Sequence, residues 1–292
     1  MDRVRMSKAS WTAMALGIAF WVGSSAPLHA APVGLGAAAD FGLLVDAGDL
    51  SMGDHSIVRG TVGVWHGDSE LGYQCYVTRD LADTNITPAS VTLGESTHVV
   101  GQCSTSAGGT ITLDTGATCG SQDTTGGAAR IADLNQAVLD EEAFETVVAG
   151  LPTTQTLPAI NLGFSQTMKV FDAVHGGVNV IHVPSVTLGN FAVLYISGGV
   201  EDQLVFVIDG PLSIGKRAKI VLIGGLLKQN TFIDAQSLTI ADDYSSMQGT
   251  VHVEGGCPLG EEVTINGGLI CDGTVTTGKF LRLNAVANQL AF

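Results

Sequence analysis

Short runs of alternating apolar and polar residues fill most of the chain, and each run ends at a glycine, an asparagine or an aspartate. An alternation with a period of two is typical of β-strands that bury one of their two faces. Runs of this kind occupy residues 41–45, 56–64, 90–93, 110–113, 178–183, 191–196, 203–208, 219–223 and 250–253. Strands that are this short and this evenly spaced predict a sandwich, a barrel or a solenoid.

An internal repeat favours the solenoid. Four segments share an apolar, hydroxyl, apolar, turn pattern: VTLG at 186–189, LSIG at 212–215, LTIA at 238–241 and VTIN at 263–266. The hydroxyl residues of the four segments are 26, 26 and 25 positions apart, and they are Thr187, Ser213, Thr239 and Thr264. A period of this length indicates stacked coils. Because side chains alternate along a strand, we expect the aliphatic residues to point inward and the hydroxyls to form an outward column.

One segment of this repeat has the glycine spacing of a phosphate-binding loop. Gly210 and Gly215 followed by Lys216 fit that motif, but Arg217 stands where it requires a serine or threonine. The next run, 219–223, predicts a strand where the motif requires a helix. We therefore interpret Gly215 as the corner glycine of one coil, equivalent to Gly189, followed by a solvated basic turn.

Residues 126–150 form the exception to the β pattern. Apolar residues recur there at helical spacing: Ile131, Leu134, Val138 and Leu139. Thr124 or Thr125 can cap the start of the helix, and Gly150 and Pro152 end it. We expect one amphipathic helix whose apolar stripe lies against a sheet face.

The first thirty residues have the features of a secretory signal peptide. Arg3, Arg5 and Lys8 precede an apolar stretch, 11–23, that is too short to span a bilayer, and small residues follow it up to Ala30. We expect a mature protein of residues 31–292, secreted to the periplasm or the cell exterior and not inserted in a membrane.

The charge of the chain narrows the range of partners. The formal net charge is −15, and removing residues 1–30 takes away three basic residues and one acid, which leaves −17. Such a surface repels nucleic acid and anionic lipid, so neither is an expected partner.

Five cysteines remain after the leader, and none forms a C-x-x-C pair. In an oxidising compartment they are expected to form disulfides and not a metal site. Cys257 and Cys271 bracket one strand-turn unit, and Cys103 and Cys119 flank another. Cys75 is then the odd cysteine, although the sequence alone does not fix the pairing.

The residues that could carry catalysis or bind a metal do not converge along the sequence. The histidines at positions 55, 66, 98, 175, 182 and 252 are scattered. The acidic residues of the N-terminal region do not match an EF-hand loop, so we interpret them as a solvated edge: Asp46, Asp49, Asp54, Asp68 and Glu70. The basic cluster of Lys216, Arg217 and Lys219 has only Asp209 nearby. We expect no enzymatic activity, no catalytic residue, no metal site and no cofactor.

Several segments resemble the secreted microbial ice-binding proteins, which have a discontinuous β-solenoid with one long helix alongside. The family's opening motif, L-G-x-A-x-x-F-x-x-L, is matched by residues 35–44, and its G-x-x-G-V strand by Gly60–Val64. Later resemblances lie at 204–208, 230–232 and 249–251. The expected fold is therefore dominated by β structure: a right-handed β-solenoid (β-helix) with one long α-helix packed alongside. Residues 65–125, which contain three cysteines, do not resemble the family's usual segment.

The resemblance and the hydroxyl column together give the leading hypothesis for function, a non-catalytic protein that binds an ice surface. The candidate ice-binding residues are Thr187, Ser213, Thr239 and Thr264, with Thr250 and Thr274 as candidates on another face. A second hypothesis is an extracellular adhesion or matrix module, since related secreted surface modules look similar and residues 65–125 are atypical. A third is a polysaccharide-active β-helix enzyme, which would depend on calcium or on Lys216 and Arg217.

Overall fold

The computed structural model describes residues 34–85, 88–127, 129–171 and 177–285. The predicted signal peptide, residues 1–30, lies outside the described residues, as does His175. Residues 31–292 form one unit by their internal contacts. Within the described residues, no helix has the length and apolar character that crossing a membrane requires.

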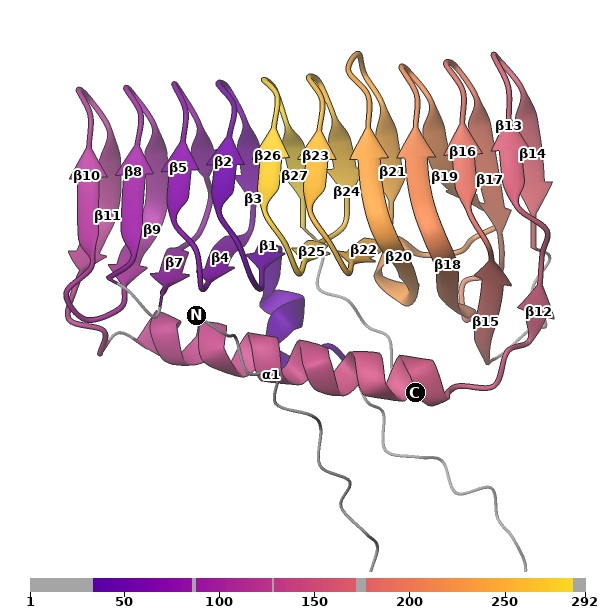
Figure 1. Ribbon diagram of the computed structural model, residues 1–292, viewed down its shortest axis with the longest axis horizontal. Coiled ribbons are helices and arrows are strands. Elements are labelled where there is room, and N and C mark those ends of the chain that lie inside the picture. Colours follow the sequence, from indigo (N-terminus) through magenta and orange to yellow (C-terminus); the bar gives the residue numbers. More distant parts are fainter. Residues whose placement is uncertain (1–33, 86–87, 128, 172–176, 286–292) are drawn as a thin grey trace, which may run out of the picture. The chain divides into compact units, whose positions relative to one another are not determined.

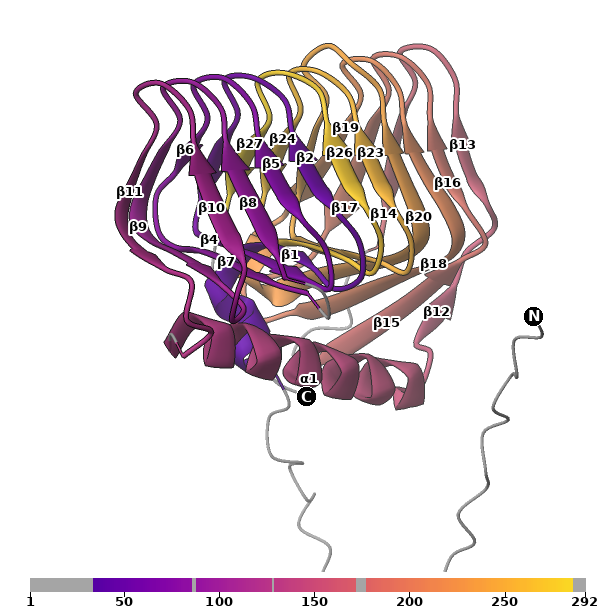
Figure 2. The same ribbon diagram turned by 60° about the vertical axis from the view of Figure 1, so that its left-hand side comes forward.

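Parallel strands stack into a solenoid with three faces (Figures 1 and 2). Face 1 consists of β2 (Leu50–Met52), β5 (Ser69–Leu71), β8 (Ser90–Leu93), β10 (Thr110–Leu113), β13 (Ile160–Leu162), β16 (Val186–Leu188), β23 (Cys257–Leu259), β26 (Val275–Thr277) and the last residues of β18 (Gln203–Ile214) and β20 (Thr231–Ile240). These strands lie side by side in Figure 2. The predicted β-solenoid is therefore the observed fold.

The other two faces complete each coil. Face 2 consists of β3 (Ile57–Arg59), β6 (Tyr76–Val77), β14 (Thr167–Val170), β17 (Val193–Ser197), β19 (Lys219–Ile223), β21 (Ser246–Gln248), β24 (Thr264–Asn266), β27 (Arg282–Asn284) and the first residues of β9 (His98–Thr105) and β11 (Thr118–Asp123). Face 3 consists of β1 (Phe41–Val45), β4 (Thr61–Trp65), β7 (Leu81–Thr84), β12 (Gln155–Thr156), β15 (Val178–Val183), β22 (Thr250–Val253), β25 (Leu269–Cys271) and the remaining parts of β9, β11, β18 and β20.

The order of the coils along the solenoid differs from their order in the chain. β1 pairs with both β4 and β25, β2 with both β5 and β26, and β3 with both β6 and β27. The first coil therefore stacks on the last one, near the middle of the row (Figure 1). The atypical segment 65–125 forms β5–β11, which add coils at one end of the row. The helix then leads to β12 at the opposite end (Figure 1).

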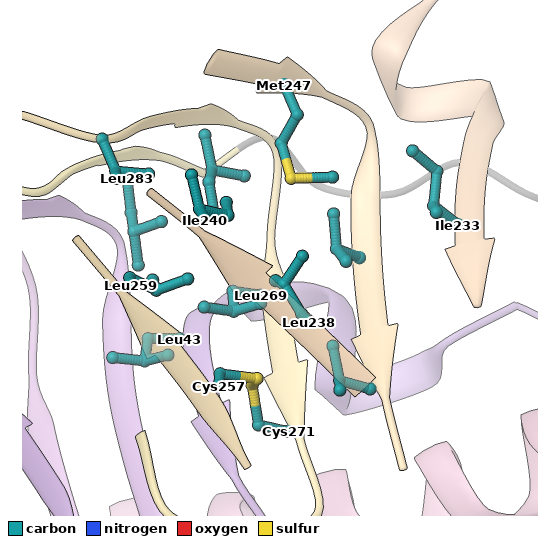
Figure 3. Packing of buried hydrophobic residues seen from close by; sticks show 14 of the residues in the cluster. Leu43, Ile233, Leu238, Ile240, Met247, Cys257, Leu259, Leu269, Cys271 and Leu283 are labelled. Atoms are coloured by element: carbon teal, nitrogen blue, oxygen red, sulfur yellow. A yellow bond between two sulfur atoms is a disulfide. The ribbon is translucent and has the colours of Figure 1, made fainter. Parts of the chain in front are cut away.

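The interior of the coils is filled by aliphatic side chains. Leu238, Ile240, Leu259 and Leu269 point toward one another between the faces, as Figure 3 shows. Each such side chain contributes roughly 1.5–3 kcal/mol to folding when it is fully buried. This core accounts for the alternation of apolar and polar positions along the strands.

Two disulfides tie the coils: one joins β9 to β11 of the adjacent coil, and the other joins β23 to β25 within one coil. Cys103 bonds to Cys119 with a Cα–Cα distance of 5.9 Å, and Cys257 bonds to Cys271 with one of 6.5 Å. These are the pairs to which the sequence spacing pointed, and Cys75 is left as a buried free thiol. The second disulfide lies inside the core (Figure 3).

The helix α1 (Ala129–Gly150) runs along face 3 and spans the row of coils (Figure 1). The helix begins after the predicted residue 126, because Gly126 has a left-handed backbone with φ +71°. Its buried stripe packs on side chains of face 3 and consists of Ile131, Leu134, Ala137, Val138, Glu141, Phe144 and Val148. The prediction that Leu139 belongs to this stripe is wrong. Leu139 is 57% exposed because a step of five residues from Leu134 rotates it away from the sheet.

The corner between faces 1 and 2 has a regular backbone. Residues with positive φ recur there from coil to coil, and they include His55, Gln74, Ser96, Ser165, Phe191, Arg217, Glu262 and Phe280. The N–H of Phe191 donates to the carbonyl of Lys216 in the next coil, and the N–H of Arg217 donates to that of Asp243. Gly215 belongs to the turn before this position, as Gly189 does. A Cβ on Gly215 would lie 2.8 Å from the Leu188 carbonyl oxygen, so the close approach of the preceding coil requires glycine.

Candidate functional site

A column of short polar side chains runs along the outside of face 1. The strand register places one outward residue from each coil in this column, in the order Asn161, Thr187, Ser213, Thr239, Pro258, Thr276, Ser51, Glu70, Thr92 and Thr112. Their neighbours along each strand, such as Leu238 and Ile240, are buried. Seven of the ten positions carry a hydroxyl, so this first column is a nearly continuous hydroxyl array.

A second column lies two residues earlier on the same strands. It contains the register pairs Pro211 with Ser237 and Ser90 with Thr110, and by the same register it includes Ser185, Thr274, Asp49 and Asp68. Residues two apart on a strand project from the same side of a sheet. Thr110 and Thr112, Ser90 and Thr92, and Thr274 and Thr276 therefore form hydroxyl pairs across face 1.

The charge on face 1 is low and local. Glu70 is the one charged residue of the first column. In the second column, Asp49 and Asp68 accept hydrogen bonds from the backbone of the next coil: Asp68 N–H to Asp49 Oδ1 at 3.0 Å, and Ser90 N–H to Asp68 Oδ1 at 2.8 Å. These carboxylates belong to the two adjacent coils that contain β2 and β5, and the two columns carry uncharged groups in the other coils.

Face 1 is also rigid and uncovered within the described residues. Its strands are held by parallel ladders, which space neighbouring strands about 4.7–4.9 Å apart. The helix lies on face 3, where it packs against Val180, Val205 and Phe232. A plane of regularly spaced hydroxyl and methyl groups is thus presented to solvent by a fixed scaffold.

The structure brings together three of the four hydroxyls predicted to form a column. Thr187 pairs with Ser213, and Ser213 pairs with Thr239. Thr274 is exposed and belongs to the second column of the same face, not to another face. The fourth predicted member, Thr264, does not belong to the array.

Thr264 lies on β24 of face 2, between Ser246 and Arg282 in the register. The prediction failed because the coils shorten after β20. The next residue in the column after Thr239 is Pro258, 19 positions on, and the coil does not keep the earlier period of 26. The segment VTIN therefore lies on face 2, although it has the same apolar, hydroxyl, apolar pattern as the segments on face 1.

Thr250 cannot present its hydroxyl to an external surface. It lies on β22 of face 3, is only 3% exposed, and is the register partner of Phe232 on β20. Its prediction as a surface residue is corrected by this burial.

The sequence pattern missed several members of the array. Ser51, Thr92, Thr112 and Thr276 occupy the segments LSMG at 50–53, VTLG at 91–94, ITLD at 111–114 and VTTG at 275–278. The first three segments have the same apolar, hydroxyl, apolar pattern, and VTTG departs from it only at Thr277, so the signal was present. In these coils, successive positions of the column are 18 to 22 residues apart, so they do not fit the period of 26.

The basic cluster lies apart from this array. Lys216 pairs with Asp243 at 3.3 Å at the corner between faces 1 and 2. The Arg217 guanidinium lies 5.5 Å from the ring centre of Phe191 and 5.7 Å from that of Tyr244. This arrangement, with Lys216 and Arg217 exposed, fits the predicted solvated turn.

Comparisons with known proteins find similarity to ice-binding proteins. A family model described as Ice-binding-like matches residues 51–279. The chain is similar to the structure of an ice-binding protein with antifreeze activity from an Arctic yeast, with 17% identity, a TM-score of 0.55, and coverage of 87% of this chain and 94% of that one. A glycosylated ice-binding protein from Arctic yeast gives 17% identity, a TM-score of 0.52 and coverage of 90% and 96%.

A third structure, an ice-binding protein from an Antarctic biological consortium, gives 16% identity, a TM-score of 0.50 and coverage of 92% and 96%. At these identities the likeness shows a shared fold over nearly the whole length of the other chains. No curated protein sequence matches the chain.

Proposed function

The chain belongs to the Ice-binding-like family, and from this premise we propose that it is a secreted antifreeze protein that binds ice through face 1. Bound at the surface of a crystal, the protein would slow the growth and recrystallisation of ice. The predicted leader and the two disulfides support its secretion, because disulfides persist in oxidising compartments.

The observation that carries this proposal is the double column of hydroxyl residues on face 1. An ice-binding surface has to hold water in an ordered layer, which requires a flat, rigid and mostly uncharged set of methyl and hydroxyl groups. Strands about 4.8 Å apart repeat at a distance close to one in the ice lattice. Thr187, Ser213 and Thr239 are register neighbours and supply this repeat directly.

The structure offers less support for the adhesion hypothesis. That hypothesis assigned binding to the atypical residues 65–125. These residues form β5–β11 and add Thr92 and Thr112 to the first column. The segment therefore extends the hydroxyl array.

The test compares two lysine substitutions on different faces. Thr239→Lys sets a strongly hydrated ammonium group in the first column. Thr264→Lys makes the same change on face 2, beside Arg282. Both sites lie at the surface, so both variants should keep the fold, which circular dichroism and thermal denaturation would establish.

Thermal hysteresis and inhibition of ice recrystallisation are then measured on residues 31–292 and both variants. We expect activity in the parent protein, a loss of most of it in Thr239→Lys, and little change in Thr264→Lys. The reverse order of the two variants would move the ice-binding site to face 2. An inactive parent protein would reject ice binding altogether.

A further inference from the structure

A buried histidine beneath the helix faces several carboxylates. His252 lies on β22, is fully buried, and stacks on Phe232. Its Nδ1 is 2.8 Å from Asp234 Oδ1. Its Nε2 points at three carboxylate oxygens, with distances of 2.6 Å to Glu145, 3.2 Å to Glu141 and 3.2 Å to Asp272. A single ring nitrogen is therefore shared by three acids that come from two separate elements of the fold.

Glu141 places an unsatisfied, buried carboxyl oxygen inside the cluster. This residue occupies the apolar stripe of α1 and is only 2% exposed. Its Oε1 has no hydrogen-bond partner of suitable geometry, although it lies near His252 Nε2. An ionised carboxylate in such a position is costly unless it is paired or bound to a metal. One proton on Nε2 can be donated along only one direction, so it cannot satisfy Glu141, Glu145 and Asp272 together.

The geometry points to a binding site for one divalent transition-metal ion, with Zn²⁺ as the best match, held by Glu141, Glu145, His252 and Asp272. One oxygen or nitrogen atom from each of the four residues lies within 4.8 Å of all the others. One imidazole nitrogen with carboxylate oxygens is a donor set that suits Zn²⁺, whereas Ca²⁺ favours six to eight oxygens.

Asp234 supplies the outer contact that such a site requires. A metal-binding histidine usually donates its second ring N–H to a carboxylate, which fixes the tautomer and the ring orientation. With its proton on Nδ1 and donated to Asp234, His252 directs the lone pair of Nε2 at the centre of the cluster. The histidine is thus oriented as a ligand by the protein itself.

The surroundings of the His252 cluster are acidic and open to solvent at one side. Asp46 lies close enough that burial and the charges of Asp272, Glu142 and Glu145 raise its pKa to about 6. A pocket of ≈ 380 Å³ next to the cluster is lined in part by Glu145, Asp234 and Glu254. This pocket provides a route for an ion, and its acidic lining attracts cations.

A metal ion at this position would fasten the helix to the solenoid. Glu141 and Glu145 belong to α1, His252 to β22, and Asp272 follows β25. The bond would thus join α1 to two adjacent coils of face 3. Its effect is on stability and does not involve face 1, so it is independent of ice binding.

The first test measures zinc binding by the folded protein. Residues 31–292 are freed of metal with a chelator and titrated with ZnCl₂ by calorimetry, with native mass spectrometry to count ions. We expect one Zn²⁺ per chain and a rise in Tm of about 5 °C or more at a hundredfold excess over Kd. MnCl₂ and CaCl₂ are titrated in parallel. Binding of Ca²⁺ more tightly than Zn²⁺, or no zinc binding by the folded protein, would overturn the proposal.

Isosteric variants locate the ion. Glu145→Gln and Asp272→Asn each remove one ligand charge at a partly exposed residue, so both should fold even if a His252 variant does not. We expect each to weaken zinc binding by ~10-fold or more. Glu142→Gln makes the same change on the exposed side of α1 and should bind zinc as the parent protein does. Equal zinc affinity in Glu145→Gln, Asp272→Asn and Glu142→Gln would contradict the assignment.

Discussion

Thr276 pairs with Ser51 in parallel register, although the two residues come from opposite ends of the chain. The pair joins the coils that precede the helix in sequence to those that follow it. Because Thr276 continues the column of Thr187, Ser213 and Thr239, and Ser51 continues that of Thr92 and Thr112, one plane extends across the junction. The size of the proposed ice-binding surface depends on this contact.

A lysine at the junction should therefore act on the whole surface. Thr276→Lys places a charge in the middle of the first column and is expected to remove most of the thermal hysteresis, as Thr239→Lys does. Thr118→Lys on face 2 is the matched control, since Thr118 is also exposed on a strand. Full activity in Thr276→Lys would mean that only one half of face 1 contacts ice.

Replacing the charged member of the first column should increase activity. Glu70 interrupts the hydroxyls between Ser51 and Thr92. Glu70→Thr removes the hydrated carboxylate and supplies a methyl and a hydroxyl group at that position, so we expect greater thermal hysteresis at equal protein concentration. Glu201→Thr, at an exposed position outside the column, is the control for the lost charge. An unchanged or lower value for Glu70→Thr would argue against ice contact at this coil.

The stability of the protein should fall as pH rises because of Asp83. This residue on β7 is fully buried, and its Oδ2 accepts a hydrogen bond from Ser69 Oγ at 2.5 Å. Burial raises the pKa of its carboxyl group from 3.8 to about 8. The folded protein thus holds a proton that the unfolded chain releases near pH 4. The contribution of Asp83 is greatest at low pH and is lost as pH rises from about 4 to 8.

Asp83→Asn mimics the protonated side chain and isolates this effect. The parent protein should lose up to a few kcal/mol of unfolding free energy from this group between pH 5 and pH 8.5, since each pKa unit corresponds to about 1.4 kcal/mol. The variant should show a smaller loss over the same interval. Chemical denaturation at both pH values provides the comparison, and parallel pH profiles would refute the role given to Asp83.

Thiol reactivity should distinguish Cys75 from the four bonded cysteines. Cys75 is buried, and burial raises the pKa of its thiol to about 11. A thiol-reactive reagent should label no cysteine in the folded protein at neutral pH, because the thiolate is the reactive form. Unfolding without a reductant should release one thiol, and unfolding with a reductant should release five. Two or more reactive thiols after unfolding alone would show that one disulfide had not formed.

The sequence predicted those parts of the fold that depend on local pattern. The repeat around Thr187, Ser213 and Thr239 was visible because those coils have equal length, and the helix was visible because its apolar residues recur at helical spacing. The position of Thr264 was not predictable in this way, since a change in coil length moves a strand to another face without altering its own pattern.

The cluster around His252 was beyond reach for a related reason. Its residues belong to α1, β22 and the position after β25, and no short spacing connects them in the chain. One hint was present in the sequence, because Glu141 falls at an apolar-stripe position of the helix. Recognising it required knowing that Leu139 faces solvent and that the stripe passes through Glu141 instead.

The stacking of the first coil on the last has a topological consequence. The two ends of the described fold meet, since a Cβ on Gly42 would lie 3.0 Å from the Cβ of Ala285. A chain that ran from β12 to β27 and then from β1 to β11 would wind through the same coils in unbroken order. The natural fold is thus a circular permutation of a simple solenoid, opened in the middle of the stack. Because permutation would turn pairs such as Thr276 and Ser51 into contacts between successive coils, the natural order has the higher contact order and the slower expected folding.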